Sequence, residues 1–130
     1  MDRDKAMQLY VRAAHQGSPW GQYYTANFLR ETGNLEEAFL YCKLAAEQGL
    51  AQAEHHLALH YMRGHGVGRD FDEGRRWCAR AAANGAEEAR TMLKEIDAEF
   101  EKVREAAARG YEPAIKQLAD LNLAIGGWRT

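Results

Sequence analysis

Four histidines near the middle of the chain have the side chains of a metal site: His55, His56, His60 and His65. His56 and His60 are four residues apart, a spacing that places both on one face of a helix, as in many zinc-binding helices. The residues between them are Leu-Ala-Leu, so the glutamate of an H-E-x-x-H zinc protease is missing. A metal-dependent or hydrolytic enzyme using this cluster is an alternative. The preferred interpretation has no catalytic residue, metal ligand or cofactor.

The other candidate nucleophiles are one serine and two cysteines. Ser18 precedes Pro19, where a hydroxyl caps a helix, and no S-x-x-K or G-x-S-x-G motif surrounds it. Cys42 and Cys78 each lie seven residues before a glycine, which predicts equivalent environments one repeat apart. Stacked helices lie about 8 to 10 Å apart, farther than the roughly 7 Å Cα separation that a disulfide tolerates. We therefore expect two buried free thiols.

Composition excludes several classes of function. The 130 residues carry 17 Lys plus Arg and 19 Asp plus Glu, a formal charge of −2. A slightly acidic chain without a basic run argues against nucleic acid as a partner. No apolar run approaches the roughly 20 residues of a bilayer span, and residues 1–4 contain no apolar signal core. These features predict one cytoplasmic domain that binds no membrane.

An internal repeat organises the elements that would position these side chains. The pattern Ala-Ala-x-x-Gly ends at four spacer glycines: Gly17, Gly49, Gly85 and Gly110. A small residue follows each spacer glycine by four positions, and we expect these residues to be contact points between helices: Gly21, Ala53, Ala89 and Ala114. Periodicity and capping signals predict helices at 3–16, 19–31, 35–48, 51–63, 71–84, 87–109 and 112–125.

The ends of these helices have recognisable capping residues. The spacer glycines are expected to close helices in the left-handed conformation. Ser18 is expected to cap the helix that begins at Pro19, and Asn34 and Asp70 open capping-box-like segments. In the loop Gly64-His65-Gly66-Val67-Gly68, the glycines are expected to supply positive φ angles, and Val67 is expected to fill the apolar seam of a hairpin.

Residues 50–85 carry a longer motif. It consists of Ala53, Leu57, Ala58 and Tyr61 on the first helix, the Gly64-x-Gly66-Val67 loop, Asp70, and then Trp77 and Ala81-Ala82 on the second helix. This segment resembles one full unit of the Sel-one-like repeat family, which is tetratricopeptide-like. Residues 18–49 resemble a second unit, and residues 2–17 resemble the second helix of a half unit. The resemblance implies an all-α fold, a right-handed α-α superhelix or solenoid of about two to two and a half helical-hairpin repeats.

Beyond Leu93 the sequence departs from this family pattern. Lys94 and Glu99 occupy small-residue positions, and an unbroken apolar stripe continues to Ala107. We therefore predict one long helix, with a break near Asp97 as the alternative. Residues 86–130 would form C-terminal capping helices, with 111–125 folding back antiparallel and Gly126-Gly127 ending the last helix, so that residues 1–130 make a single helical-repeat domain.

The resemblance implies a scaffold that binds a protein or peptide segment in a concave groove lined by the first helices. Helical spacing places eight side chains in that groove: Trp20, Tyr24, Asn27, Gln52, His56, Leu59, Arg63 and Met92. Several are of types enriched at interaction hot spots. In an alternative, Trp20 and Tyr24 instead bury against Tyr10 and Val11. A further alternative is self-association of a repeat fragment, in which the uncovered helix at the N-terminus makes a homo-oligomer.

Overall fold

The computed structural model describes the backbone of residues 2–124 and the side chains of residues 2–118. Its regular secondary structure is all helical in this part, and short turns and one loop connect the helices. The helices are α1 (Arg3–His15), α2 (Pro19–Glu31), α3 (Leu35–Glu47), α4 (Ala51–Arg63), α5 (Phe71–Ala83), α6 (Glu87–Ala108) and α7 (Glu112–Ala124). The expected helices are confirmed to within one residue. The expected end at Ile125 and the terminating pair Gly126-Gly127 lie outside the described residues.

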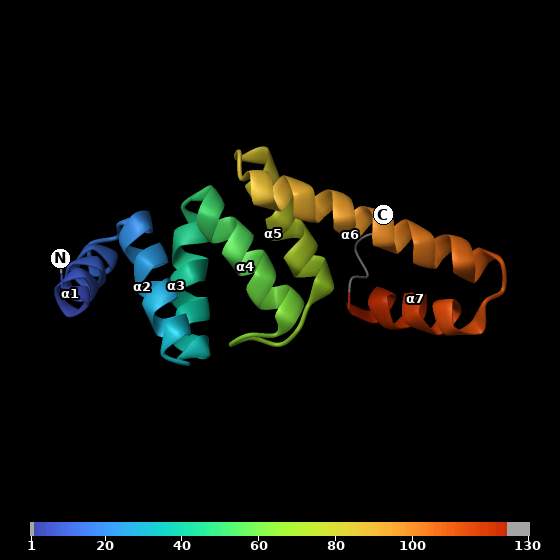
Figure 1. The fold of residues 1–130 in the computed structure, drawn as a ribbon, viewed down its shortest axis with the longest axis horizontal. Coiled ribbons are helices and arrows are strands. Elements are labelled where there is room, and N and C mark those ends of the chain that lie inside the picture. Colours follow the sequence, from blue (N-terminus) through green and yellow to red (C-terminus); the bar gives the residue numbers. More distant parts are fainter. Residues whose placement is uncertain (1, 125–130) are drawn as a thin grey trace.

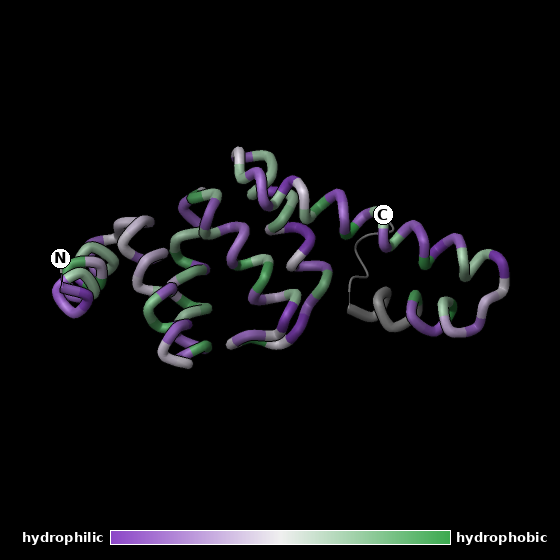
Figure 2. The backbone as a smooth tube through the Cα atoms, in the orientation of Figure 1, coloured by the Kyte–Doolittle hydropathy of each residue, from purple (hydrophilic) through white to green (hydrophobic). Residues whose placement is uncertain are grey.

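The helices stack in chain order, each packing against the next, from α1 at one end to α7 at the other (Figure 1). Hydrophobic and hydrophilic residues are interspersed along the coloured part of the tube (Figure 2), as expected of helices that pack through one apolar side. The result is an open α-α solenoid, which confirms the expected fold class. No helix in the described part of the chain has the length and apolar character needed to cross a bilayer.

The spacer glycines end helices as expected. Gly17, Gly49, Gly85 and Gly110 have φ angles of 89°, 87°, 97° and 84°, in the left-handed region that residues with a Cβ avoid. Each lies one residue after the C-cap of its helix.

Two of the three predicted N-caps are confirmed. Ser18 Oγ accepts a hydrogen bond from the Gly21 amide at 3.2 Å, and Asp70 Oδ1 accepts one from the Glu73 amide at 3.1 Å.

The prediction for Asn34 was wrong. Its side chain makes no capping bond to α3 and instead donates to Thr32 Oγ1 at 3.0 Å. That hydroxyl donates to carbonyls in the last turn of α2. Asn34 therefore supports the end of the preceding helix through Thr32.

Small residues lie at the helix crossings. Gly21, Ala53, Ala89 and Ala114 are all buried. A Cβ added to Gly21 would lie 2.6 Å from the Ala14 amide nitrogen, so α1 approaches α2 too closely for any side chain at this position. The expectation that these residues are interhelical contact points is confirmed.

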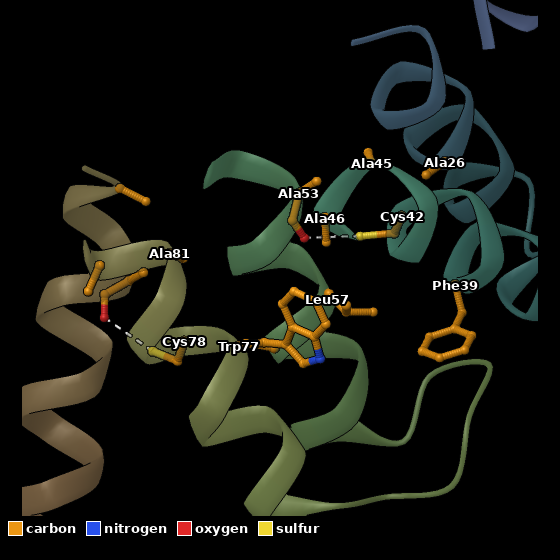
Figure 3. Close-up of a cluster of buried hydrophobic side chains, with 14 residues drawn as sticks. Ala26, Phe39, Cys42, Ala45, Ala46, Ala53, Leu57, Trp77, Cys78 and Ala81 are labelled. Atoms are coloured by element: carbon orange, nitrogen blue, oxygen red, sulfur yellow. Dashed lines mark hydrogen bonds between the residues drawn. The ribbon is translucent and has the colours of Figure 1, made fainter. Parts of the chain in front are cut away.

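The two cysteines occupy equivalent buried positions. Cys42 Sγ donates to the Ala53 carbonyl at 3.3 Å, and Cys78 Sγ donates to the Ala89 carbonyl at 3.2 Å (Figure 3). Both thiols are free. Burial raises the pKa of Cys42 to about 12 and that of Cys78 to about 11, which suppresses the reactive thiolate. Both side chains are structural.

The glycine-rich loop connects α4 and α5. Gly64 and Gly66 have φ angles of 69° and 77°, as expected, whereas Gly68 is not in the positive region. Val67 packs against the core. A Cβ at Gly66 would overlap the carbonyl group of Leu35, so the loop presses against the start of α3 in the preceding unit.

A polar contact recurs at equivalent positions in the two full units. Gln48 Nε2 donates to Gln22 Oε1 at 2.8 Å, and Asn84 Nδ2 donates to Glu54 Oε1 at 2.7 Å. In both units the donor directly precedes a spacer glycine, and the acceptor is the fifth residue after the previous one. We call this contact the amide clasp. It joins the second helix of a unit to its own first helix and gives a partner to Glu54, whose exposure is only 2%.

The amide clasp is not repeated after α5, and residues 86–110 do not form the helical hairpin of a repeat unit. The positions equivalent to the two clasp residues hold Arg90 and Arg109, two cations that cannot form this hydrogen bond. The long helix is confirmed as continuous: Asp97, where the alternative broke it, lies within α6 and pairs with Arg75 of α5 at 3.0 Å. After Gly110, α7 returns antiparallel along α6 (Figure 1).

Candidate partner-binding face

The first helices of the units, α2 and α4 and the beginning of α6, lie in one row. Tyr23 Oη of α2 lies 3.2 Å from His56 Nε2 of α4. The second helices make the corresponding contact on their own row, where Tyr41 Oη of α3 lies 3.3 Å from His15 Nε2 of α1. We call the surface of the first row the first-helix face. It is defined by the eight side chains that the sequence predicted: Trp20, Tyr24, Asn27, Gln52, His56, Leu59, Arg63 and Met92.

Aromatic rings gather at the amino-terminal end of this face. Tyr24 stacks on Tyr10 of α1, with ring centroids 4.6 Å apart, and on Trp20, with centroids 5.8 Å apart. Tyr23 meets Trp20 edge to face at 5.9 Å and His56 edge to face at 5.2 Å. Such pairs contribute about 0.5–1.5 kcal/mol each beyond the area they bury. We call these five residues the aromatic cluster.

Two members of the aromatic cluster remain open to solvent although they pack on one another. The exposed fraction is 45% for Trp20 and 37% for Tyr24. Tyr10 stacks on Tyr24, as the burial alternative expected, but this contact does not cover the two rings. The structure therefore offers a fixed aromatic surface, because the rings are ordered by their neighbours and still accessible.

His56 links the aromatic cluster to a cation. Arg30 Nη1 donates to His56 Nδ1 at 2.8 Å, because a guanidinium has no acceptor atom. The proton of the neutral imidazole is thereby assigned to Nε2, which donates to Tyr23 Oη at 3.2 Å. Burial, and then the charge of Arg30, lower the pKa of His56 to about 4. This side chain is neutral at physiological pH.

The other histidines do not join His56 in a metal site. His60 is buried, its Nδ1 donates to the His65 carbonyl at 2.7 Å, and its ring meets Phe39 edge to face at 5.9 Å. It therefore serves the α4–α5 loop, whereas His56 reaches toward α2. Among the residues that the structure describes, no three His, Cys, Asp or Glu side chains are placed to hold a metal ion.

The remaining predicted residues lie along the rest of the face. Gln52 and Arg63 are exposed, whereas Asn27, Leu59 and Met92 are half-buried. Met92 also packs against the hydrophobic core, so only part of it is available to a partner. The contacts described above bring Trp20, Tyr24 and His56 into one cluster, and the other five residues make none of these ring contacts.

Two residues that shape this face, Tyr23 and Arg30, are not among the eight predicted from the sequence, and Tyr10 was expected to contact Trp20 and Tyr24 only in the burial alternative. Tyr23 lies one position before the predicted Tyr24, and Arg30 lies three positions after Asn27, the last predicted residue of α2. A stripe that is one residue wide and ends at Asn27 omits both. Tyr10 is equivalent to Cys42 and Cys78. A ring in place of a thiol at that position signals that α1 makes a different contact with the next helix.

Two surface hollows lie away from these eight residues. One runs along α1 and is lined by Asp4, Met7, Gln8, Val11, Arg12 and His15. The other lies between the start of α3 and Gly66. None of the eight residues of the first-helix face lines either hollow.

Comparison with known proteins identifies the repeat. The sequence profile of the Sel1 repeat matches residues 2–18, 22–50 and 51–85. The crystal structure of a Sel1 repeat protein from Oxalobacter formigenes superposes with a TM-score of 0.62 at 30% identity, covering 81% of this chain and 29% of that one.

Two curated proteins are also similar. DAP3-binding cell death enhancer 1 of Mus musculus is 32% identical over 97 residues, which are 73% of this chain and 19% of that protein. The chitin synthase regulator SKT5 of Malassezia restricta is 40% identical over 60 residues, which are 46% of this chain and 4% of that protein. The chain thus spans a fifth or less of the length of these relatives.

Proposed function

The chain belongs to the Sel1 repeat family, and from that premise we propose that it binds a peptide or protein segment along its first-helix face. Proteins of this family are generally scaffolds for protein interactions, without catalytic activity of their own. The proposed partner lies across α2 and α4 and reaches the beginning of α6. Trp20, Tyr24, His56, Leu59 and Arg63 are the proposed anchors.

The exposed, ordered pair Trp20 and Tyr24 is the observation that carries this proposal. Large aromatic side chains lose little conformational entropy on binding and dominate the energetics of many interfaces. Here the stacking on Tyr10 and the edge contacts of Tyr23 hold the two rings before a partner arrives. A preordered surface reduces the entropic cost of association.

The names of two relatives agree with a role in binding other proteins. One is described as DAP3-binding and the other as a regulator of chitin synthase. The matched segment covers a small part of each, so neither partner is transferred to this chain. Only the class of partner, a protein, is proposed.

The test compares partner recovery by the wild type and by the double variant Trp20→Ala, Tyr24→Ala. Partners are captured from a cell extract and quantified by mass spectrometry, with helical content checked by circular dichroism. Tyr111→Ala is the matched control, because Tyr111 is also an exposed aromatic residue but lies between α6 and α7. We expect the double variant to lose partners that the control retains. Equal recovery of partners by the double variant and by Tyr111→Ala would refute the proposal.

Self-association through α1 is a second candidate function. Leu9 is 49% exposed, whereas its equivalent Trp77 is buried beside Leu57 of the preceding first helix (Figure 3). A surface hollow lined by Met7, Gln8 and Val11 lies on the same helix. Sedimentation velocity of the wild type and Leu9→Arg over a wide concentration range tests this candidate. A wild-type monomer at every concentration would exclude it.

We further propose that residues 1–130 act as one domain in the cytoplasm. Contacts between successive helices run without interruption from α1 to α7, which supports a single cooperative unit. The two free, buried cysteines suit a reducing compartment.

A further inference from the structure

We infer that the first-helix face selects an acidic segment: a partner aspartate or glutamate pairs with Arg30 while a neighbouring apolar side chain lies on Trp20 and Tyr24. This inference rests on the proposed function and specifies the partner's chemistry. It follows from the position of Arg30, the hydrogen bonds that orient it, and the charges around it.

The guanidinium of Arg30 is held in place by a neutral group. Its Nη1 donates to His56 Nδ1 at 2.8 Å, and His56 is fixed in turn by Tyr23 Oη at 3.2 Å. In the described part of the chain, no other acceptor bonds to Arg30 and no carboxylate lies within ion-pair distance of it. The side chain is therefore oriented without being neutralised, and most of its five donors stay available.

Two arginines whose charges act on the histidines of this face are Arg63, which acts on His55, and Arg30, which acts on His56. Arg63 at the end of α4 is exposed and likewise has no ion-pair partner among the described residues. Glu31, next to Arg30 in sequence, is already paired with Arg3 of α1. One carboxylate opposes these cations: the charge of Glu88 of α6 acts on His55 and His56, although no ion pair joins Glu88 to Arg30.

The Arg30 guanidinium and the exposed rings of Trp20 and Tyr24 together indicate a partner that carries a carboxylate beside an apolar group. Arg30 lies on α2, the helix that carries Trp20 and Tyr24, and it donates to His56, a member of the aromatic cluster. A guanidinium presents paired donors that match the two oxygens of a carboxylate. A short segment with an acidic residue next to an aliphatic or aromatic one would satisfy both parts of the surface.

The experiment is a selection from a display library of random twelve-residue peptides on the wild-type protein. Individual recovered peptides are then synthesised and titrated against variants by fluorescence anisotropy. We expect recovered sequences to contain more Asp and Glu than the starting library. Arg30→Gln should weaken their binding by roughly tenfold, and Arg30→Lys by less, because the charge is kept and the paired donors are lost. Circular dichroism confirms that the variants fold.

The control is Arg104→Gln, which removes the same charge from an exposed arginine of α6. It should leave affinity unchanged. Peptides that lack acidic enrichment, or that bind Arg30→Gln as well as Arg104→Gln, would overturn the inference. If such peptides are still lost on Trp20→Ala, Tyr24→Ala, the proposed function stands without it. If every recovered peptide binds the double variant as well as the wild type, the result counts against the proposed function and against this inference.

Discussion

Asn84 donates a hydrogen bond to the buried Glu54 carboxylate. Replacing Asn84 by Ala should therefore lower the free energy of unfolding, and replacing it by Asp should lower it further. The two side chains meet at 2.7 Å, and Glu54 is 2% exposed. Asn84→Ala removes a hydrogen bond to an ionised group, worth about 1.5–3 kcal/mol. We expect the lower end, because Asn84 itself is exposed and water can replace part of the bond. Asn84→Asp should be worse, since two charges at about 4 Å repel by roughly 4 kcal/mol at an effective dielectric constant of about 20.

Urea unfolding followed by circular dichroism measures these differences in the free energy of unfolding. For a chain of 130 residues each kcal/mol also corresponds to a change in Tm of about 4 °C. Asn34→Asp is the control: it makes the same substitution at an exposed residue before α3, where a negative charge favours the helix dipole by about 0.3–1 kcal/mol. If Asn84→Asp were as stable as Asn84→Ala, the amide clasp would not hold the Glu54 carboxylate.

Three further outcomes are expected. Thr25→Val should raise the free energy of unfolding by about 1 kcal/mol, because Thr25 Oγ1 is buried without a hydrogen-bond partner among the described residues; Thr91→Val, at an exposed position, is the control for the change of residue type. The free energy of unfolding of the wild type should fall as the pH drops from about 6.5 to about 4, because the unfolded chain binds a proton that folded His56 excludes. The upper limit of this loss is about 3 kcal/mol. His56→Gln should show a shallower pH profile in urea unfolding. Gly21→Ala should lower Tm by several degrees, because its Cβ would meet the Ala14 amide, whereas a neutral result in calorimetry would contradict the close approach of α1 and α2.

The architecture follows from features that act locally or repeat. Spacer glycines and the capping residues Ser18 and Asp70 are sufficient to place the helix ends. The unbroken apolar stripe after Leu93 predicts the long α6, because a hairpin would need a loop that the sequence does not provide. Asn34 misled the prediction because its amide had a competing acceptor, the Thr32 hydroxyl, which the order of residues alone does not reveal.

The candidate site was less predictable, because it depends on how long side chains reach between helices. Helical spacing places Trp20, Tyr24 and His56 on first helices, but it does not determine that Arg30 reaches His56 across the gap from α2 to α4. The amide clasp was missed for a different reason. The repeat was aligned on its small and apolar residues, and the clasp lies at polar positions that change type between units, from Gln22 and Gln48 to Glu54 and Asn84.

The amide clasp also makes the unit at residues 50–85 transferable. Glu54 and Asn84 both lie within this segment, as do the loop and the two helices that it joins. A duplicate inserted in tandem would bring its own matched pair and present the same surfaces to its neighbours. Residues 86–110 lack this property, since they form the single helix α6 instead of a hairpin and hold Arg90 and Arg109 at the clasp positions. Protein engineers could therefore lengthen this array from its middle, with α6 and α7 kept as the terminus.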